Sequence, residues 1–190
     1  MIQSILIVSS AEKSLSFFQD ILSQTQYEEI TAVKTCGEAR RLLIERTFDL
    51  CIINAPLCDE FGQTFATSII EEKVNQVILI VRDELYDEIS SKVEECGVLT
   101  ISKPVSRAVF WTALKLANAS FNKLHRLKNE NSNLNRKIED ISIVNRAKLV
   151  LIDYLGMSEE QAHKHIEKQA MDMRTTRANI ARNILKTYES

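Results

Sequence analysis

The chain has 190 residues, a formal net charge of −2, 45% hydrophobic residues and 26% charged residues, which is the composition of an ordinary soluble protein rather than a disordered or fibrous one. The charge is unevenly spread: residues 1–110 carry 10 Lys and Arg against 17 Asp and Glu, whereas residues 111–190 carry 14 against 9. This asymmetry predicts that the back half meets an anionic partner.

The compartment follows from what the sequence lacks. The start of the chain has no basic region followed by a long apolar run, and the longest strictly aliphatic run, residues 77–81, is far too short to cross a bilayer. The four cysteines, which form no C-x-x-C pair, are Cys36, Cys51, Cys58 and Cys96. We therefore expect free thiols in a reducing cytoplasm and no contact with a membrane.

Short aliphatic runs alternate with helical patterns through the first 105 residues. Strands are expected at 5–8, 28–33, 50–53, 77–81 and 98–101, with helices at 15–22, 37–46, 64–72 and 85–96. This alternation predicts an α/β fold with a five-stranded, doubly wound parallel sheet. The working site of such a sheet lies beyond the carboxyl ends of its strands.

Residues 1–118 resemble the receiver domain of bacterial response regulators, which has a CheY-like, flavodoxin-like fold. The resemblance rests on the segment DLCIIN at 49–54, on Gly62 and Gly97, and most sharply on the pair Lys103-Pro104. The family uses an acidic pair after the first strand, an Asp phosphoryl acceptor after the third, and a Thr or Ser after the fourth.

The chemistry of the family is largely missing from this chain. The corresponding positions hold Ser9, Ser10, Asn54 and Val81, and only Lys103 is retained. Phosphoryl transfer to a receiver needs a carboxylate nucleophile and a Mg²⁺ ion held by carboxylates. We therefore predict a degenerate phosphorylation site with no catalytic residue, no cofactor and no metal, in a pseudo-receiver controlled without phosphorylation.

Three questions remain open for this domain. The first is whether Asp59 and Asp83, which lie near the rim, act as weak metal ligands. The input is a bound protein, such as a sensor or a sequestering partner, a small molecule, or nothing beyond control of dimer formation. Lys103 hydrogen-bonds either Asn54 or a backbone carbonyl.

Residues 110–150 predict one long helix, because no Gly or Pro interrupts them. Apolar residues recur at alternating spacings of three and four from Phe110 through Ala113 and Ala117, as in a coiled coil. The positions expected to form a dimer seam are Leu124, Leu127, Asn131, Leu134, Ile138 and Ile141. We expect residues 119–140 to be a dimerising coiled-coil linker, with Asn131 fixing its register; the alternative is a helix packed on its own domain.

Residues 141–190 predict a small three-helix bundle. The first helix continues to Leu155 and stops at Gly156, and Ser158 and Gln161 form a capping box for the second. Thr175 or Thr176 caps the third. Each helix is too short to be stable alone, so the three bury their apolar faces together.

This back segment strongly resembles the ANTAR domain over residues 138–186. The matching stretches are NRAK at 145–148, Leu151, LGMSEEQA at 155–162, QAMDMR at 169–174 and IARNIL at 180–185. Members of that family are non-enzymatic transcription antitermination regulators. The resemblance implies a homodimer that binds paired RNA hairpins in a nascent leader transcript and keeps the terminator from forming.

Basic and polar side chains of this segment suit RNA, which is bound through phosphates and through unpaired loop bases. The predicted RNA-binding residues are Arg146, Lys148, Arg174, Thr175, Arg177 and Arg182. Lys148 and Arg174 match the family motif, and part of this set is expected to be plain solvated charge. His163 and His165 are expected to be surface residues, and an RNA contact is the minor alternative. Alternatives to RNA binding are a DNA-binding or a protein-binding transcription factor.

Overall fold

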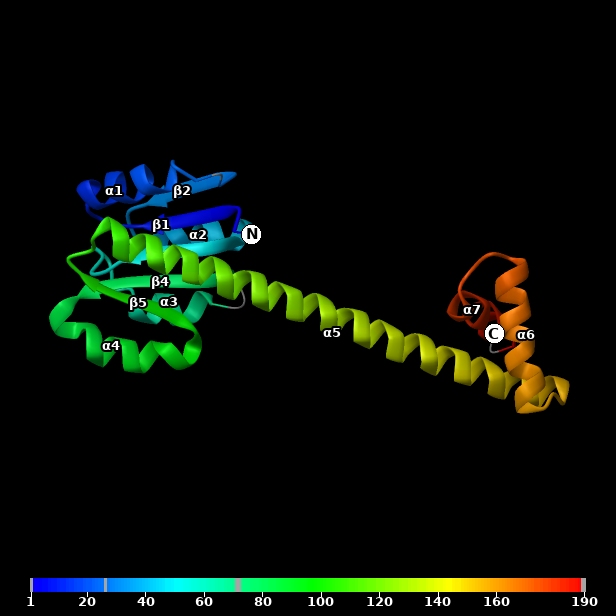
Figure 1. The fold of residues 1–190 in the computed structure, drawn as a ribbon. Helices are drawn as coiled ribbons and strands as arrows, with labels where there is room; N and C mark the ends of the chain where they lie inside the picture. The colour runs from blue at the N-terminus through cyan, green and yellow to red at the C-terminus, as the bar shows by residue number, and fades with distance from the viewer. Residues whose placement is uncertain (1, 26, 71–72, 189–190) are drawn as a thin grey trace. The chain divides into compact units, whose positions relative to one another are not determined.

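The structure is a computed structural model that describes residues 2–25, 27–70 and 73–188. The chain divides into two compact units, Met1–His125 and Arg126–Ser190. Helix α5, Arg107–Leu155, contributes its first turns to one unit and its remainder to the other. It is a single uninterrupted helix, as the absence of Gly and Pro predicts (Figure 1).

The first unit is built on a five-stranded, wholly parallel sheet, which confirms the predicted fold class. Its strands are β1 (Ser4–Val8), β2 (Glu29–Val33), β3 (Phe48–Asn54), β4 (Val74–Arg82) and β5 (Val98–Lys103). They lie in the order β2-β1-β3-β4-β5, with Val8 beside Ile53 and Asn54 beside Ile80. The central strands β1, β3 and β4 are almost continuously apolar because helices cover both faces of the sheet.

The two faces of the sheet bury separate apolar clusters. One face packs against α1 (Glu12–Leu22) and the start of α5. The other packs against α2 (Cys36–Glu45), α3 (Gln63–Ile69) and α4 (Tyr86–Val93). The predicted helix at 85–96 is in fact α4 flanked by two short 3-10 turns, Asp83–Leu85 and Glu94–Cys96. The predicted helix at 64–72 ends at Ile69, and residues 71 and 72 lie outside the described part.

The first turns of α5 correct one prediction. Phe110, Ala113 and Ala117, which share the spacing of the predicted seam, are buried in the first unit, and the Phe110 ring lies 4.9 Å from that of Phe18. The seam therefore begins later, and the alternative of a helix packed on its own domain holds for this stretch. Helix α5 starts at Arg107 because the Ser106 side chain caps it, accepting a hydrogen bond from the Val109 N–H.

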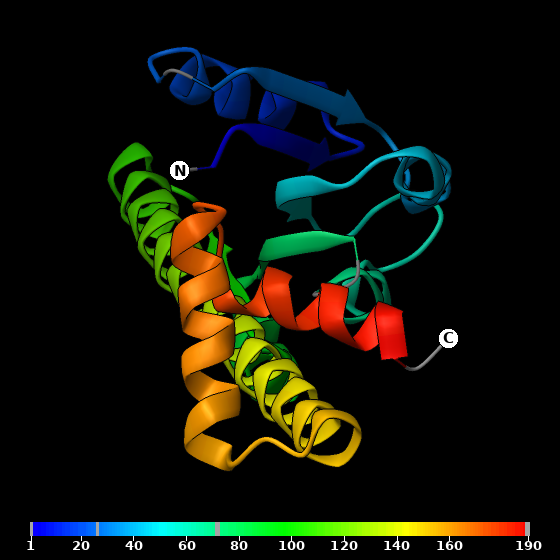
Figure 2. The same ribbon diagram turned by 90° about the vertical axis from the view of Figure 1, so that its right-hand side faces the viewer.

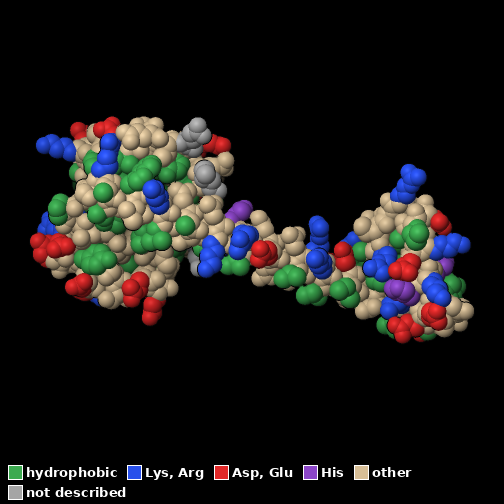
Figure 3. Space-filling model, in the orientation of Figure 1, with side chains coloured by type: hydrophobic (Ala, Val, Ile, Leu, Met, Phe, Trp, Pro, Cys, Tyr) green, Lys and Arg blue, Asp and Glu red, His purple; other side chains and the backbone are tan. Residues whose placement is uncertain are grey.

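Further along α5, the predicted seam residues are exposed. Leu124, Leu127, Leu134, Ile138 and Ile141 have between 47% and 65% of their surface open to solvent. Hydrophobic side chains gather along one edge of this stretch (Figure 3). Aliphatic side chains left open at heptad spacing are typical of a helix that packs against another helix.

The second unit packs the end of α5 against α6 (Glu159–Asp172) and α7 (Arg177–Tyr188), which Figure 2 shows joined by a short turn. Its core is small and rich in alanine, whose short side chain lets the helices approach one another closely. The residues of this core cluster are Ala147, Val150, Leu151, Ala162, Ile166, Ala170, Ile180, Ala181 and Ile184. Leu155 is 48% exposed because α5 ends there, at Gly156 with φ 65°. The capping box of Ser158 and Gln161 is present.

Among the described residues, no helix combines the length and the hydropathy that crossing a membrane requires.

Candidate nucleic-acid interface

The carboxyl edge of the sheet holds the residues predicted as a degenerate phosphorylation site. Asn54 Nδ2 donates a hydrogen bond to Ser9 Oγ at 2.9 Å, and both residues are buried. Lys103 Nζ donates to the carbonyl oxygen of Ala55 at 2.5 Å, so a backbone carbonyl, and not Asn54, is its partner. Burial, with a smaller contribution from Arg82, lowers the pKa of Lys103.

Ser10 and Val81 complete the predicted set but do different work. Ser10 Oγ donates to the Lys34 carbonyl at 3.1 Å and accepts from the Cys58 N–H at 3.0 Å, so it ties neighbouring loops together. Val81 is fully buried in β4, and its side chain has no polar atom. The edge thus presents a hydroxyl and an amide bonded to each other, where the receiver family has a carboxylate.

Asp59, one of the two possible metal ligands, caps a helix instead. Its carboxylate accepts hydrogen bonds from the Cys36 and Gly37 N–H groups at 3.2 and 2.9 Å, at the start of α2. Burial raises the pKa of Asp59, but the backbone N–H donors outweigh it and leave the pKa lowered. Cys36, Asp59 and Glu60 bring their ligand atoms within 4.8 Å of one another. Burial keeps the pKa of the Cys36 thiol well above its usual range, and Glu60 pairs with Arg40, so this cluster is engaged within the fold.

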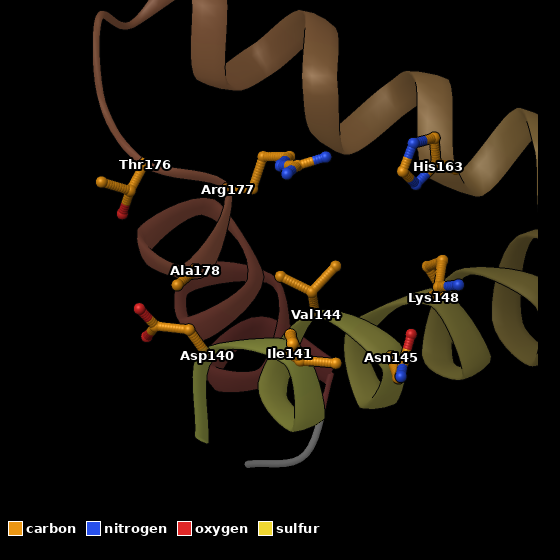
Figure 4. A pocket seen from close by; sticks show the side chains of 9 residues that line it. All are labelled: Asp140, Ile141, Val144, Asn145, Lys148, His163, Thr176, Arg177 and Ala178. Atoms are coloured by element: carbon orange, nitrogen blue, oxygen red, sulfur yellow. The ribbon is translucent and has the colours of Figure 1, made fainter. Parts of the chain in front are cut away.

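The second unit contains a pocket of about 350 Å³ between α5, α6 and α7 (Figure 4). Ile141 and Val144 form an apolar wall, and Lys148 and Arg177 bring two of the predicted RNA-binding side chains to it. The full lining is Asp140, Ile141, Val144, Asn145, Lys148, His163, Thr176, Arg177 and Ala178.

Helical spacing explains how this lining comes together. Ile141, Val144, Asn145 and Lys148 recur every three or four residues and therefore share one face of α5. Thr176 precedes α7 and caps it, because its Oγ1 accepts a hydrogen bond from the Asn179 N–H at 3.2 Å; this decides between the two predicted caps.

The cations of the pocket are held by carboxylates of α6. Lys148 Nζ lies 3.1 Å from Glu159 Oε1, and the Lys148 side chain is only 16% exposed. Glu167 Oε1 lies 3.1 Å from Arg177 Nη1 and 3.4 Å from His163 Nε2. The carboxylate partners Glu159 and Glu167 are 77% and 45% exposed, and an ion pair with a solvent-exposed partner contributes about 0–1 kcal/mol, so these pairs orient the cations and can be exchanged for another anion at small cost.

Arg182 and Thr175 lie apart from the cations of the pocket and support the bundle. Arg182 Nη2 donates to Asp140 Oδ1 at 2.9 Å and its Nη1 donates to Asn179 Oδ1 at 3.1 Å, which links α7 to α5. Thr175 Oγ1 accepts from Asn179 Nδ2 at 3.0 Å. Arg146 is exposed and, at about 100° per residue, points roughly 160° away from Lys148 around α5. The structure therefore does not bring Arg146 to the pocket.

Arg174 occupies an unusual backbone position in the turn between α6 and α7. Its φ is 50°, in the left-handed region where Gly or Asn is usual. The Thr175 N–H donates to the Ala170 carbonyl and the Arg174 N–H to the Met171 carbonyl, which is the Schellman arrangement for ending a helix. Within residues 2–25, 27–70 and 73–188, no hydrogen bond or ion pair engages the exposed Arg174 side chain.

The sequence indicated only that His163 is a surface residue, and it gave no sign that Glu159 and Glu167 form ion pairs at the pocket. The signal for one pair was present, because His163 and Glu167 are spaced i, i+4 on a predicted helix. Contacts between helices, such as Lys148 with Glu159, leave no comparable trace in the sequence.

Comparison with known proteins shows what the two units are. The receiver domain of an HD domain-containing protein from Pseudomonas fluorescens superimposes on 66% of this chain and 93% of that one, with a TM-score of 0.58 and 26% identity. The non-phosphorylated HemR receiver domain from Leptospira biflexa covers 60% of this chain and 93% of its own, with a TM-score of 0.54 and 26% identity. Residues 132–185 match the family profile of the ANTAR domain.

The chain is a receiver-fold domain fused to an ANTAR domain. The similarity to one relative extends over most of the chain: the transcriptional regulatory protein PdtaR of Mycobacterium tuberculosis is 26% identical over 168 residues, which is 88% of this chain and 82% of that protein. The nitrate regulatory protein of Klebsiella oxytoca is 35% identical over 72 residues, 38% of this chain and 18% of that protein. The ANTAR match contains every residue that lines the pocket.

Proposed function

We propose that this protein is an RNA-binding transcription antitermination regulator. As a homodimer, its ANTAR domains hold paired hairpins in a nascent leader transcript, so that the competing terminator hairpin does not form. The observation that carries the proposal is the pocket of the ANTAR domain, which Lys148, Arg177, Thr176 and Asn145 line together with the apolar side chain of Val144. Cationic groups suit the phosphates of an RNA loop, and neutral hydrogen-bonding groups suit the edges of its unpaired bases.

Dimer formation is supported by the exposed aliphatic stripe of α5. The five aliphatic seam residues, from Leu124 to Ile141, are all about half or more exposed in the single chain. Covering them against a second copy removes apolar surface from water at about 25 cal/mol per Å². Asn131 lies in the same stripe and is exposed, as a residue that pairs with its counterpart in the partner helix has to be.

Control without phosphorylation is supported by the sheet edge. The Asn54 amide is not a phosphoryl acceptor, and its side chain is already bonded to Ser9 in a buried position. The proposal is that the receiver domain acts by association, through a bound protein, a small molecule or dimer control alone.

The test is direct binding to RNA. Fluorescence anisotropy with a labelled double-hairpin leader is compared with a scrambled RNA and with duplex DNA at the same salt concentration. We expect tight binding to the hairpins only, and a slope of about −2 to −3 in log K against log salt if about three phosphates are contacted. Equal affinity for the scrambled RNA, or preference for the duplex DNA, would remove the proposal.

Side-chain roles are tested by charge removal. Lys148→Ala and Arg177→Ala are each expected to weaken hairpin binding several-fold and to make the salt slope shallower by about 1. The matched control is Lys13→Ala, which removes one exposed charge from α1 of the receiver domain. If the control weakens binding as much as the other two, the contact is not specific to the ANTAR domain.

A further inference from the structure

The first unit has a pocket of its own between α5 and the segment that joins α1 to β2. Its volume is about 340 Å³, at the lower end of the range in which proteins bind small ligands. Thr25 and Tyr27 come from the segment before β2, and α5 supplies the other lining residues, which are Trp111, Leu114, Lys115, Asn118 and Asn122. Asn118 Oδ1 accepts a hydrogen bond from the Ile2 N–H at 3.3 Å, just before β1. The pocket therefore lies where the strands begin, at the edge of the sheet opposite the degenerate phosphorylation site.

This pocket combines aromatic and aliphatic surface with one cation. Trp111 and Tyr27 are partly buried and pack against the core of the first unit, and Leu114 is 1% exposed. Lys115 is exposed, and the described residues give its ammonium group no ion pair or hydrogen bond. None of the described lining residues is acidic. A ligand in this pocket therefore meets an unpaired positive charge beside an apolar surface.

Hydrogen bonding sets what the ligand has to offer. The Asn118 amide is used within the fold, because its Nδ2 donates to the Leu114 carbonyl at 3.1 Å while its Oδ1 accepts from Ile2. The described part of the chain supplies no acceptor for the Trp111 indole N–H. Both this N–H and the Lys115 ammonium group can only donate hydrogen bonds. The pocket therefore favours a ligand that brings acceptors and negative charge, which is a carboxylate attached to a planar apolar body.

The exposed aliphatic stripe of α5 lies on a different face of the helix. Counting back in sevens from Leu124 and Leu127 places positions 110, 113, 117 and 120 on the same face as the stripe. At about 100° per residue, Trp111, Lys115 and Asn122 point roughly 130–170° away from the middle of that face. A second copy packed along the stripe therefore does not compete with a ligand in the pocket.

We propose that this pocket binds a small aromatic carboxylate. The ring of the ligand packs against Trp111 and Leu114, and its carboxylate pairs with Lys115. Because most of the lining belongs to α5, the bound molecule contacts the helix that continues into the ANTAR domain. Its role as the small-molecule input of the receiver domain rests on the proposed function, whereas binding itself does not depend on RNA.

The experiment uses the full-length protein with phenylacetate or benzoate as the ligand. Trp111 is the only tryptophan of the chain, so its fluorescence and its single indole N–H resonance in proton–nitrogen correlation spectra both report occupancy of the pocket. We expect saturable binding with a dissociation constant on the order of 1 mM or lower, which suits a ligand of this size. Phenylacetamide keeps the ring without the charge and is expected to bind about 3- to 5-fold more weakly than phenylacetate. Acetate keeps the charge without the ring and is expected to bind at least about tenfold more weakly.

Lys115→Ala then assigns the carboxylate to its partner. This variant is expected to bind phenylacetate about 3- to 5-fold more weakly and phenylacetamide as the wild type does, so that the preference for the charged ligand disappears. Lys115→Arg keeps the charge and is expected to keep the preference. The matched control is Lys123→Ala, which removes an exposed cation of the same helix outside the pocket. Since both lysines are exposed, neither change removes a core contact.

The inference is wrong if neither phenylacetate nor benzoate changes the fluorescence or the indole resonance of Trp111. It is also wrong if Lys115→Ala keeps the full preference for phenylacetate over phenylacetamide, or if Lys123→Ala loses that preference to the same extent. The titrations with hairpin RNA are separate from these. Their failure would refute the proposed function and leave the ligand site standing, whereas failure of the ligands to bind would leave RNA binding untouched.

Discussion

Replacing Arg174 by glycine separates what the backbone requires from what the side chain does. Arg174 has a φ of 50°, a conformation that costs an L-residue about 1–2 kcal/mol and costs glycine almost nothing. Glycine also makes the unfolded chain more flexible, which returns about 0.4–1 kcal/mol to the unfolded state. Because the described residues record no partner for the Arg174 side chain, little else is lost. We therefore expect Arg174→Gly to raise the free energy of unfolding by about 0.5–1 kcal/mol.

The same variant is expected to bind RNA less well. If Arg174 contacts a phosphate or a base edge, its removal lowers affinity by about 1–3 kcal/mol, or roughly 5- to 150-fold. Urea unfolding followed by circular dichroism measures the first effect, and anisotropy with the hairpin RNA measures the second. Arg174→Ala is the control, because it loses the side chain and keeps the backbone cost. A glycine variant that is less stable than the wild type would refute the backbone argument, and one that binds RNA with undiminished affinity would refute the functional one.

Three other outcomes are expected. The double variant Leu134→Asp and Ile138→Asp places charges in the exposed stripe of α5 and is expected to turn a dimer into a monomer in light scattering; an unchanged mass would place the interface elsewhere. Asn54→Asp restores a carboxylate but not the acidic pair, so neither it nor the wild type should gain an acyl phosphate from acetyl phosphate and Mg²⁺, as phosphate-sensitive electrophoresis would reveal. The pKa values of Asp59 and Glu60 are lowered by backbone donors and by Arg40, so their stabilisation is complete above pH 4.5 and is lost as the pH falls through the lowered values. Thermal unfolding of the double amide variant, Asp59→Asn with Glu60→Gln, should show a flatter acid limb than the wild type.

The sheet could be predicted from sequence because its strands are short apolar runs that only burial on both faces explains. β1, β3 and β4 were found within a few residues of their expected bounds for this reason. The capping box of α6 was equally local, since Ser158 and Gln161 signal it by spacing alone. Features that depend on four or five neighbouring residues were therefore available from the sequence.

Features that depend on what a residue packs against were not available in the same way. Phe110 and Leu124 share one heptad pattern, yet the first is buried in the receiver core and the second is 47% exposed. Periodicity gives the face of a helix but does not say whether its own domain or another copy covers that face. The pocket was even less predictable, because its lining residues come from three helices and no sequence pattern specifies how far apart those helices lie.

The ion pairs of the ANTAR domain connect its stability to its function. Lys148 joins α5 to α6, Arg177 joins α7 to α6, and Arg182 joins α7 to α5, so each pair of helices is linked by one cation that the sequence predicts to bind RNA. A phosphate that takes Lys148 or Arg177 must displace a glutamate of α6, so the net gain is the difference between two ionic contacts rather than the whole of one. If the protein binds RNA as proposed, these ion pairs are expected to keep its general affinity for polyanions low, so that most of the discrimination comes from groups without such a competitor. In the described part of the chain these include the Arg174 side chain, for which no hydrogen bond or ion pair is recorded, and the Asn145 amide, so the proposed preference for RNA hairpins is expected to depend on these two groups more than on Lys148 or Arg177.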